Sequence, residues 1–287
     1  MSLVPFLHRA AAGENLTSDQ AHQAMSVLLE GRATEAAIAG FLVALRMKGE
    51  TASELAGFAR AMREKSVFVD AGPDVIDIVG TGGDSAGTFN ISTVAAIIIA
   101  GAGAGKAGAA DTGTGARVAK HGNRAISGRV GSADVLEALG VRIALTPEES
   151  VRAIREIGLG FLFAPHLHPA MKYAQSVRRE LKMRTVFNLL GPLANPARAQ
   201  YQVIGAPSSE AAQIMAEASS QRICTASTIR SLPPRPRARA RAWGFRSATG
   251  LFRNTAAPSK CRIAGRAAPV SESIFRSPAG RRPAGRL

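Results

Sequence analysis

The segment DIVGTGGDSAGTFNIST, residues 77–93, decides the expected fold, because it joins a strand-like apolar run to a helix-like one through a glycine-rich stretch. Its four glycines leave the backbone bare enough to approach an anionic ligand closely. The N–H groups at the start of the following helix, near Asn90 and Ile91, would point toward that ligand. The pattern indicates a phosphate-binding loop, and a plain glycine-rich turn is the alternative.

Short polar side chains surround the start of that helix. Asn90, Ser92 and Thr93 can cap the helix, donate to phosphate oxygens or bind a magnesium ion. The carboxylate of Asp84 would repel a phosphate. We therefore expect Asp84 to meet a ribose hydroxyl, a backbone N–H or a metal-bound water.

Outward from this segment, strand-like and helix-like runs alternate. VIDIVG and ARVAKHG have strand character, whereas NISTVAAIIIAGAG, GSADVLEALG and TPEESVRAIREIG have helix character. In the last run Thr146 is placed at the N-cap, Pro147 at the first helical position and Glu149 at the third. Such alternation predicts an α/β domain with a central sheet flanked by helices.

The part of the chain before Pro73 predicts a small helical domain. Thr17 with Gln20 and Thr51 with Glu54 have capping-box spacing and mark two helix starts. Between them the sequence ATEAAIAGFLVALRMKG places its apolar residues on one face of a third helix. We expect three short helices with ordinary packing roles.

A second loop has the same character as the first. Residues 120–134, KHGNRAISGRVGSAD, follow a predicted strand and combine basic and hydroxyl side chains, a set suited to a pyrophosphate or a ribose phosphate. Ligands of open α/β sheets lie beyond the carboxyl ends of the strands. Two such loops predict one shared site, and a solvated charged loop is the alternative. The polar residues are Lys120, Asn123, Arg124, Ser127, Arg129 and Ser132.

Composition limits the class of protein. A chain of 287 residues with 46% hydrophobic content can bury one large core or two modest ones, as a soluble α/β enzyme does. The apolar run from Val94 to about Ala104 is shorter than the ~20 residues of a membrane span. The first residues do not resemble a secretory signal, so a cytoplasmic protein is expected. Cys224 and Cys261 have no CxxC spacing, which argues against a disulfide framework or a cysteine zinc site.

The net charge of +15 is concentrated at the end of the chain. Residues 1–218 hold 21 Lys and Arg against 20 Asp and Glu, whereas residues 219–287 hold 15 against one. This tail lacks helical or strand periodicity, and we expect it not to fold. One alternative is a disordered basic arm, which would bind nucleic acid only nonspecifically. The other is an out-of-frame reading of a GC-rich coding region, and the composition of the tail favours this second alternative. The expected domains are 1–72 (helical), 73–218 (α/β, with a segment near 165–185 packing on the helical domain) and 219–287 (tail).

Several motifs together resemble a known family. DIVGTGGD, FNIST, VAKHGNR, GSADVLEALG, FLFAPHLHPAMK and RTVFNLLGPLANP are similar to the anthranilate phosphoribosyltransferases of tryptophan biosynthesis, over most of residues 15–218. The resemblance implies a homodimer whose active site lies in the cleft between a helical and an α/β domain. It implies phosphoribosyl pyrophosphate and anthranilate as substrates and Mg²⁺ as cofactor.

The resemblance also implies roles for individual residues. Lys120 and Arg178 would be catalytic, and Ser92 would bind the magnesium ion. The phosphoribosyl pyrophosphate pocket would contain Gly80, Thr81, Gly83, Asp84, Thr88, Asn90, Ile91, Ser92, Thr93, Lys120, Ser127 and Gly128. The anthranilate pocket would contain Gly80, Asn123, Arg178, His121 and His168.

Other residues compete with some of these roles. The planar guanidinium of arginine suits a carboxylate, and motif position favours Arg178 over Arg179 and Arg184. His166 and His168 lie close in sequence, but no third metal ligand is evident nearby, so a packing or pocket-lining role is expected. The segment FNLLGPLANP is interpreted as a pair of turns, one at Gly-Pro and one at Asn-Pro.

The implied reaction is attack of the anthranilate amine on the anomeric carbon of the ribose as pyrophosphate leaves. Magnesium, Lys120 and the loop N–H groups would stabilise the leaving group. Two departures from the family bear on this. About a dozen additional residues, within 101–116, precede Val118 and could displace Lys120. No Asp follows Asp134, so the family's Asp-Glu metal pair is absent, and we expect impaired catalysis and missing sheet strands.

Two other functions stay open at this point. A pyrimidine nucleoside phosphorylase-like enzyme would share the fold and the glycine loop, but its lysine motif differs from KHGNR. A non-catalytic protein that binds nucleic acid through its basic tail would need aromatic residues for stacking. The tail offers only Trp243, Phe245, Phe252 and Phe275.

Overall fold

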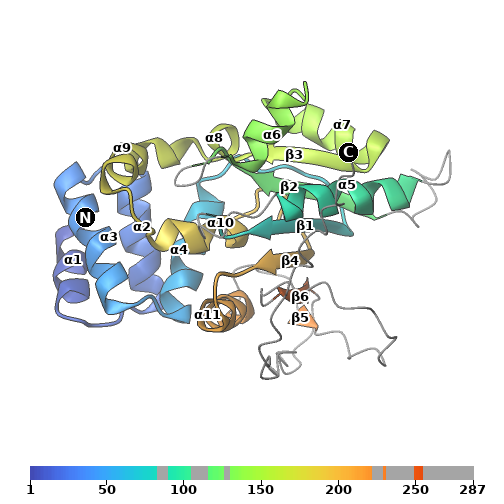
Figure 1. Ribbon diagram of the computed structural model, residues 1–287. Coiled ribbons are helices and arrows are strands. Elements are labelled where there is room, and N and C mark those ends of the chain that lie inside the picture. The colour runs from blue at the N-terminus through green and yellow to red at the C-terminus, as the bar shows by residue number, and fades with distance from the viewer. Residues whose placement is uncertain (83–89, 105–115, 126–129, 222–228, 231–248, 255–287) are drawn as a thin grey trace, which may run out of the picture.

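The computed structural model describes residues 1–82, 90–104, 116–125, 130–221, 229–230 and 249–254. A helical bundle from the first part of the chain lies beside an α/β domain built on one sheet, which is the predicted fold class (Figure 1). Within these ranges, every helix is too short or too polar to cross a membrane. The bundle contains α1 (Val4–Ala11), α2 (Ser18–Leu29), α3 (Glu35–Lys48) and α4 (Ala52–Glu64).

The bundle has four helices where the sequence predicted three. The two predicted capping boxes are confirmed: the Thr17 hydroxyl accepts from Gln20 N at 3.2 Å, and the Thr51 hydroxyl accepts from Glu54 N at 3.3 Å. Helix α3 ends at Gly49, also as predicted. Helix α1 was missed because it is short and begins without a side-chain cap.

A later segment of the chain joins the bundle. Helix α9 (Lys172–Leu181) packs on α3, and the Ser176 hydroxyl donates to the Glu35 carboxylate at 2.5 Å. Ala174 and Val177 belong to the same buried cluster as the bundle residues, which also includes Leu190 of α10 (Val186–Leu193). Helices α9 and α10 therefore connect the bundle to the α/β domain (Figure 1).

The sheet has the strand order β3-β2-β1-β4-β6-β5. Strands β1 to β4 run parallel, and β6 pairs antiparallel with β4. The predicted strands β1 and β2 are confirmed, whereas β3 and β4 were not anticipated from their short apolar runs. The strands are β1 (Val75–Gly80), β2 (Arg117–Gly122), β3 (Leu159–Phe163), β4 (Tyr201–Gly205), β5 (Ile229–Arg230) and β6 (Thr249–Asn254).

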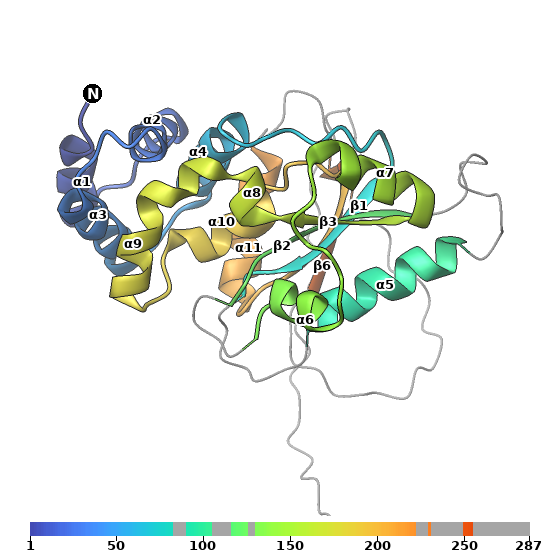
Figure 2. The same ribbon diagram turned by 90° about the horizontal axis from the view of Figure 1, so that it is seen from above.

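Helices cover both faces of the sheet. Helix α5 (Ile91–Ala104) packs on Ile78 and Val118, whereas Ile154 of α7 (Pro147–Ile157) packs with Ala119 on the opposite face (Figure 2). On the outward side of α5, the apolar side chains of Ile91, Val94, Ile97 and Ile98 are exposed among the described residues. The other helices are α6 (Ser132–Ala138), α8 (Ala164–Leu167), the 3₁₀ turn η2 (Pro169–Met171) and α11 (Ser209–Ser220).

Two local expectations need correction. The Gly191-Pro192 pair does not form a turn, because it lies inside the last turn of α10, where Pro192 is buried. The Asn-Pro turn is present, with Arg198 N donating to Asn195 O at 3.0 Å. In the tail, where no periodicity predicted an element, β5 and β6 form short strands, since β4 offers an open edge for pairing. The rest of 222–287 lies outside the described residues.

Candidate anion-binding site

Lys120 lies at the centre of the candidate site. Its side chain is 2% exposed, and Nζ donates to the Ile78 carbonyl at 2.8 Å and to the Ser92 hydroxyl at 3.1 Å. Burial lowers the pKa of Lys120 to about 8, while the nearby Asp77 carboxylate raises it. The additional residues before Val118 have therefore not moved Lys120 away from the helix that follows the first loop.

The first loop ends at the start of α5. The Asn90 carbonyl accepts from Thr93 N at 2.9 Å and from Val94 N at 3.1 Å, which places Asn90 at the N-terminus of the helix. The Thr93 hydroxyl is buried and has no hydrogen-bond partner among the described residues. Ile91, in contrast, is 42% exposed. Gly80 ends β1, and Thr81 N is already bonded to the Gly205 carbonyl at 3.1 Å.

The end of the second loop, at Gly131, lies beside the start of α5. Asn90 Nδ2 donates to the Gly131 carbonyl at 3.5 Å, a long contact that links the two segments. Asp134 closes the second loop by accepting from Gly131 N at 2.7 Å and from Ala125 N at 3.0 Å, and these backbone N–H groups hold its pKa below the usual range. The structure thus brings together Lys120, Asn90, Ser92, Thr93 and the ends of the second loop.

Arg124 does not take part in this cluster. Its guanidinium makes a bidentate pair with Glu137, donates to Asp134 and lies over the Phe163 ring. In this structure Arg124, which the sequence placed in the anion-binding loop, is paired with acidic side chains of α6. Asn123 uses its side-chain oxygen to accept from Arg124 N at 2.7 Å. Five predicted ligand-binding residues, Gly83, Asp84, Thr88, Ser127 and Gly128, lie outside the described residues, as does Arg129.

His121 and His168 form a buried pair. Their ring centroids are 5.1 Å apart. His121 Nδ1 donates to the Gly191 carbonyl at 3.0 Å, so its Nε2 carries the lone pair. Nε2 of each ring has no partner among the described residues. Burial lowers the pKa of both rings, that of His168 to about 3, with a further contribution from His121.

His168 also lies at the junction of the two domains. With Leu29 and Met62 of the bundle it lines a narrow gap between the domains. His166 is exposed, and its ring centroid lies 5.4 Å from that of Phe163. No group of three His, Cys, Asp or Glu side chains with metal-site geometry occurs in the described ranges.

Arg178 lies on α9, and its guanidinium stacks over the Phe187 ring of α10 at 5.0 Å. Burial lowers the pKa of Arg178 to about 10. Arg179 is exposed, which distinguishes the two neighbours in a way that spacing could not. Arg178 and His121 are thus both in contact with α10, Arg178 through Phe187 and His121 through Gly191.

Sequence reasoning missed three polar residues below this site, the buried Asp77 and Asn195 and the half-buried Gln202. Asp77 is fully buried, and it accepts from His121 N at 3.1 Å and from Gln202 Nε2 at 3.3 Å. Asn195 donates to the Ala119 carbonyl at 2.9 Å. A single polar residue within an apolar strand, as in VIDIVG and YQVIG, is the pattern that would have identified Asp77 and Gln202, because buried polar groups need partners.

The described residues do not form a magnesium site by themselves. Ser92 is the one predicted ligand among them, and its hydroxyl already lies 3.1 Å from the Lys120 amine, whose charge would repel a metal ion. Mg²⁺ commonly keeps few protein ligands and takes oxygens from substrate phosphates. Any magnesium ion here would thus be held mainly by phosphate oxygens.

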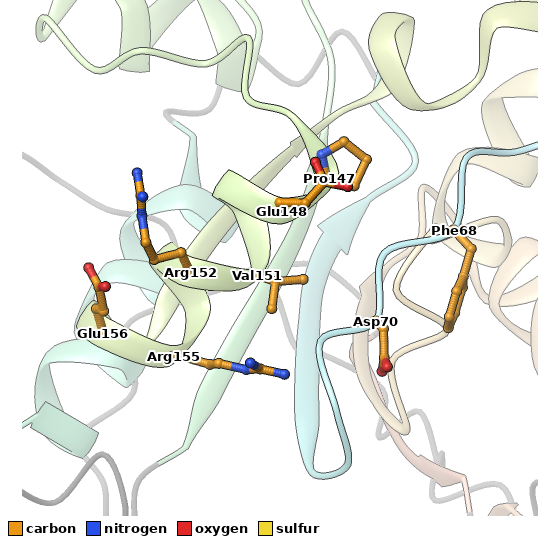
Figure 3. A pocket seen from close by; sticks show the side chains of 8 residues that line it. All are labelled: Phe68, Asp70, Pro147, Glu148, Val151, Arg152, Arg155 and Glu156. Atoms are coloured by element: carbon orange, nitrogen blue, oxygen red, sulfur yellow. The ribbon is translucent and has the colours of Figure 1, made fainter.

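A separate cavity lies away from these residues. It has a volume of about 620 Å³ and opens between α7 and the segment that leaves the bundle, where Val151 and Arg155 face Phe68 and Asp70 (Figure 3). None of the predicted site residues lines it. We therefore assign the candidate site to the loops beside Lys120 and not to this cavity.

These features define a class: two-domain proteins with a helical bundle, a mainly parallel sheet and a candidate anion site at the carboxyl ends of its parallel strands. Residues 4–66 match the glycosyl transferase family, helical bundle domain, and residues 72–228 match the glycosyl transferase family, a/b domain. This chain belongs to that glycosyl transferase family.

Within the family, the chain is similar to enzymes of one kind. It is 55% identical over 221 residues to the anthranilate phosphoribosyltransferase of Solibacter usitatus, covering 76% of this chain and 62% of the relative. The anthranilate phosphoribosyltransferase of Thermus thermophilus has a TM-score of 0.68 at 47% identity, over 78% of this chain and 64% of that structure. The Saccharomyces cerevisiae enzyme, solved in complex with PRPP and Mg, has a TM-score of 0.67 at 30% identity, over 79% and 64%. The chain thus spans about six tenths of the length of these relatives.

Proposed function

We propose that this chain carries the phosphoribosyl pyrophosphate site of an anthranilate phosphoribosyltransferase, in the biosynthesis of tryptophan. The contact that supports this best is the one between Lys120 Nζ and Ser92, because it unites the two loops that the sequence marked as anion-binding. The named relatives support the same substrates and do not favour a nucleoside phosphorylase.

In the proposed reaction the amine nitrogen of anthranilate attacks the anomeric carbon of the ribose. The bond from that carbon to the pyrophosphate oxygen breaks, its electron pair leaves with pyrophosphate, and the amine loses a proton. No covalent intermediate with the protein is needed, since an aromatic amine is already nucleophilic. Orientation of the two substrates supplies much of the rate enhancement.

Lys120 would stabilise the leaving pyrophosphate. With a pKa of about 8 its amine is largely protonated at pH 7, and its charge acts in a buried setting where electrostatic interactions are strong. The N–H groups at the start of α5 and the side chains of Asn90, Ser92 and Thr93 would bind the same phosphates. Mg²⁺ would neutralise part of the diphosphate charge, with Ser92 as its protein contact.

The anthranilate would lie near α10. Arg178 would pair with its carboxylate, and the neutral rings of His121 and His168 would line the path to the ribose. Gly80 and Asn123 complete the proposed pocket. We further propose that the active species is a cytoplasmic homodimer and that the basic tail binds nucleic acid only nonspecifically.

Calorimetric titration of the protein with phosphoribosyl pyrophosphate in the presence of Mg²⁺ tests this proposal. Replacing Lys120 with methionine (Lys120→Met) removes the charge and nearly keeps the volume. Loss of a buried charge-assisted bond is worth about 1.5–3 kcal/mol, which predicts a Kd about 10- to 100-fold higher.

Lys172→Met, on the exposed surface of α9, is the matched control and should bind as the unmodified chain does. Anthranilate fluorescence then reports turnover. The proposal is wrong if the unmodified chain does not bind phosphoribosyl pyrophosphate, or if Lys120→Met binds it equally well.

A further inference from the structure

The backbone ladder between β1 and β2 stops before the candidate site, although the two strands stay side by side. Their register contains only the pairs Val75–Arg117 and Ile76–Val118. The β1–β4 ladder has five pairs and continues to Gly80, and the β2–β3 ladder also has five pairs and continues to Gly122. The carboxyl ends of β1 and β2 are therefore joined to each other by side-chain hydrogen bonds and not by a backbone ladder.

Two side chains, one from each strand, link β1 and β2 beyond the end of this ladder. Lys120 Nζ of β2 donates to the Ile78 carbonyl of β1 at 2.8 Å. The Asp77 carboxylate of β1 accepts from His121 N of β2 at 3.1 Å. Residues adjacent in a strand point to opposite faces, so the bridges lie on the two faces of the sheet. Lys120 lies on the α5 face and Asp77 on the face toward α10.

Asp77 also closes a ring of hydrogen bonds. Its second oxygen accepts from Gln202 Nε2 of β4 at 3.3 Å, and the same nitrogen donates to the Pro192 carbonyl at 2.9 Å. The His121 ring donates to the neighbouring Gly191 carbonyl at 3.0 Å. Strands β1, β2 and β4 and the end of α10 are thus joined through one carboxylate, which no solvent reaches.

We propose that Asp77 is a positioning residue for the active site, which fixes the His121 ring and the adjacent Lys120 by bridging β1 to β2 and β4. Asp77 does not itself touch substrate, because it is fully buried beneath the strands. The functional part of this inference rests on the proposed phosphoribosyl transfer. The structural part does not.

The carboxylate is specific for this role because both of its oxygens accept from donors. Asparagine has nearly the same shape but offers one acceptor and one N–H₂ donor. In Asp77→Asn, either His121 N or Gln202 Nε2 would face a donor. Gln202 cannot simply turn its amide over, because its oxygen would then face the Pro192 carbonyl.

The test uses the full chain with Asp77→Asn, and Asp74→Asn as control. Asp74 is exposed, precedes the same strand and already has a positive φ of 61°, which asparagine tolerates well. Circular dichroism establishes that each variant is folded. The first measurement is the Kd for phosphoribosyl pyrophosphate with Mg²⁺. A misplaced Lys120 amine would make weaker charge-assisted bonds to the phosphates, so a rise in Kd of about 10- to 100-fold is expected for Asp77→Asn and none for Asp74→Asn.

The second measurement needs no ligand. Long-range ¹H–¹⁵N spectra of the histidine rings, with His121 assigned by its loss in His121→Gln, should show a single Nδ1–H tautomer in the unmodified chain and in Asp74→Asn. In Asp77→Asn the His121 signal should shift toward a mixture of tautomers. An unchanged tautomer in Asp77→Asn overturns the proposal whether or not the chain binds substrate. A changed tautomer with an unchanged Kd overturns the link to the site, whereas absence of binding by the unmodified chain would count against the proposed function alone.

Discussion

Acid should destabilise this protein through His168. The ring is 4% exposed and burial lowers its pKa to about 3, against 6.5 for an ordinary histidine. Between these two pH values His168 is protonated in the unfolded chain but stays neutral in the folded chain. The contribution of His168 to stability is therefore fully present above pH 6.5 and is lost as the pH falls toward 3.

The size of the effect follows from the shift. Each pH unit within this window costs about 1.4 kcal/mol, so the 1.5 units between the ordinary pKa and pH 5 correspond to about 2 kcal/mol. The pKa of His121 is lowered by burial too, which adds a loss of the same sign. Burial raises the pKa of Asp77, which acts in the opposite direction. A comparison with a variant that lacks only His168 separates its contribution from these two.

The assay is urea unfolding followed by circular dichroism at pH 5 and pH 8. His168→Asn removes the titrating ring, and the free-energy difference between it and the unmodified chain should change by about 2 kcal/mol between the two pH values. Leu167→Ala, at a buried neighbouring position, is the control, because it lowers stability without removing a titrating group. Curves for His168→Asn and the unmodified chain that run parallel would refute the reasoning.

Two further predictions concern packing and substrate recognition. Gly57→Ala would place a Cβ 2.1 Å from the Ser18 carbonyl oxygen and force α2 and α4 apart, so it should lower the free energy of unfolding in urea by about 1–3 kcal/mol or more. A Cβ at Gly101 would have nothing within 4 Å, so Gly101→Ala should raise the free energy of unfolding by about 0.5–1 kcal/mol. Equal effects of these two substitutions would contradict the close contact between α2 and α4. Arg178→Lys keeps the charge but loses the planar guanidinium that fits a carboxylate. In the fluorescence assay the KM for anthranilate should rise about tenfold, while the Kd for phosphoribosyl pyrophosphate stays unchanged. A rise in that Kd instead would show that Arg178 binds phosphoribosyl pyrophosphate.

Local patterns in the sequence determined the elements whose cause is local. The capping boxes at Thr17 and Thr51 and the start of α7 at Thr146 were predictable because a hydroxyl and an acid or amide three residues later satisfy N–H groups within one turn. Strand β1 and helix α5 were predictable from their own apolar runs. The α/β class followed from their alternation.

Other features depend on contacts that sequence spacing does not reveal. Gly191-Pro192 lies in a helix and not in a turn because α10 is buried against the bundle, which overrides the local preference of the pair. Arg124 pairs with the carboxylates of Asp134 and Glu137 because both lie on α6 close to its guanidinium.

The sequence by itself determined which residue types could hold a phosphate and that they follow two strands. Only the tertiary structure decided how they meet. The backbone ladder between β1 and β2 ends at Ile76 and Val118. Beyond it, Lys120 contacts Ile78 and Ser92, while Asp77 binds β2 and, through Gln202, the end of α10. The physical reason is that these partners are 28 to 125 residues apart in the chain. A buried polar group requires a partner, but its position in the sequence does not say which distant segment will supply one.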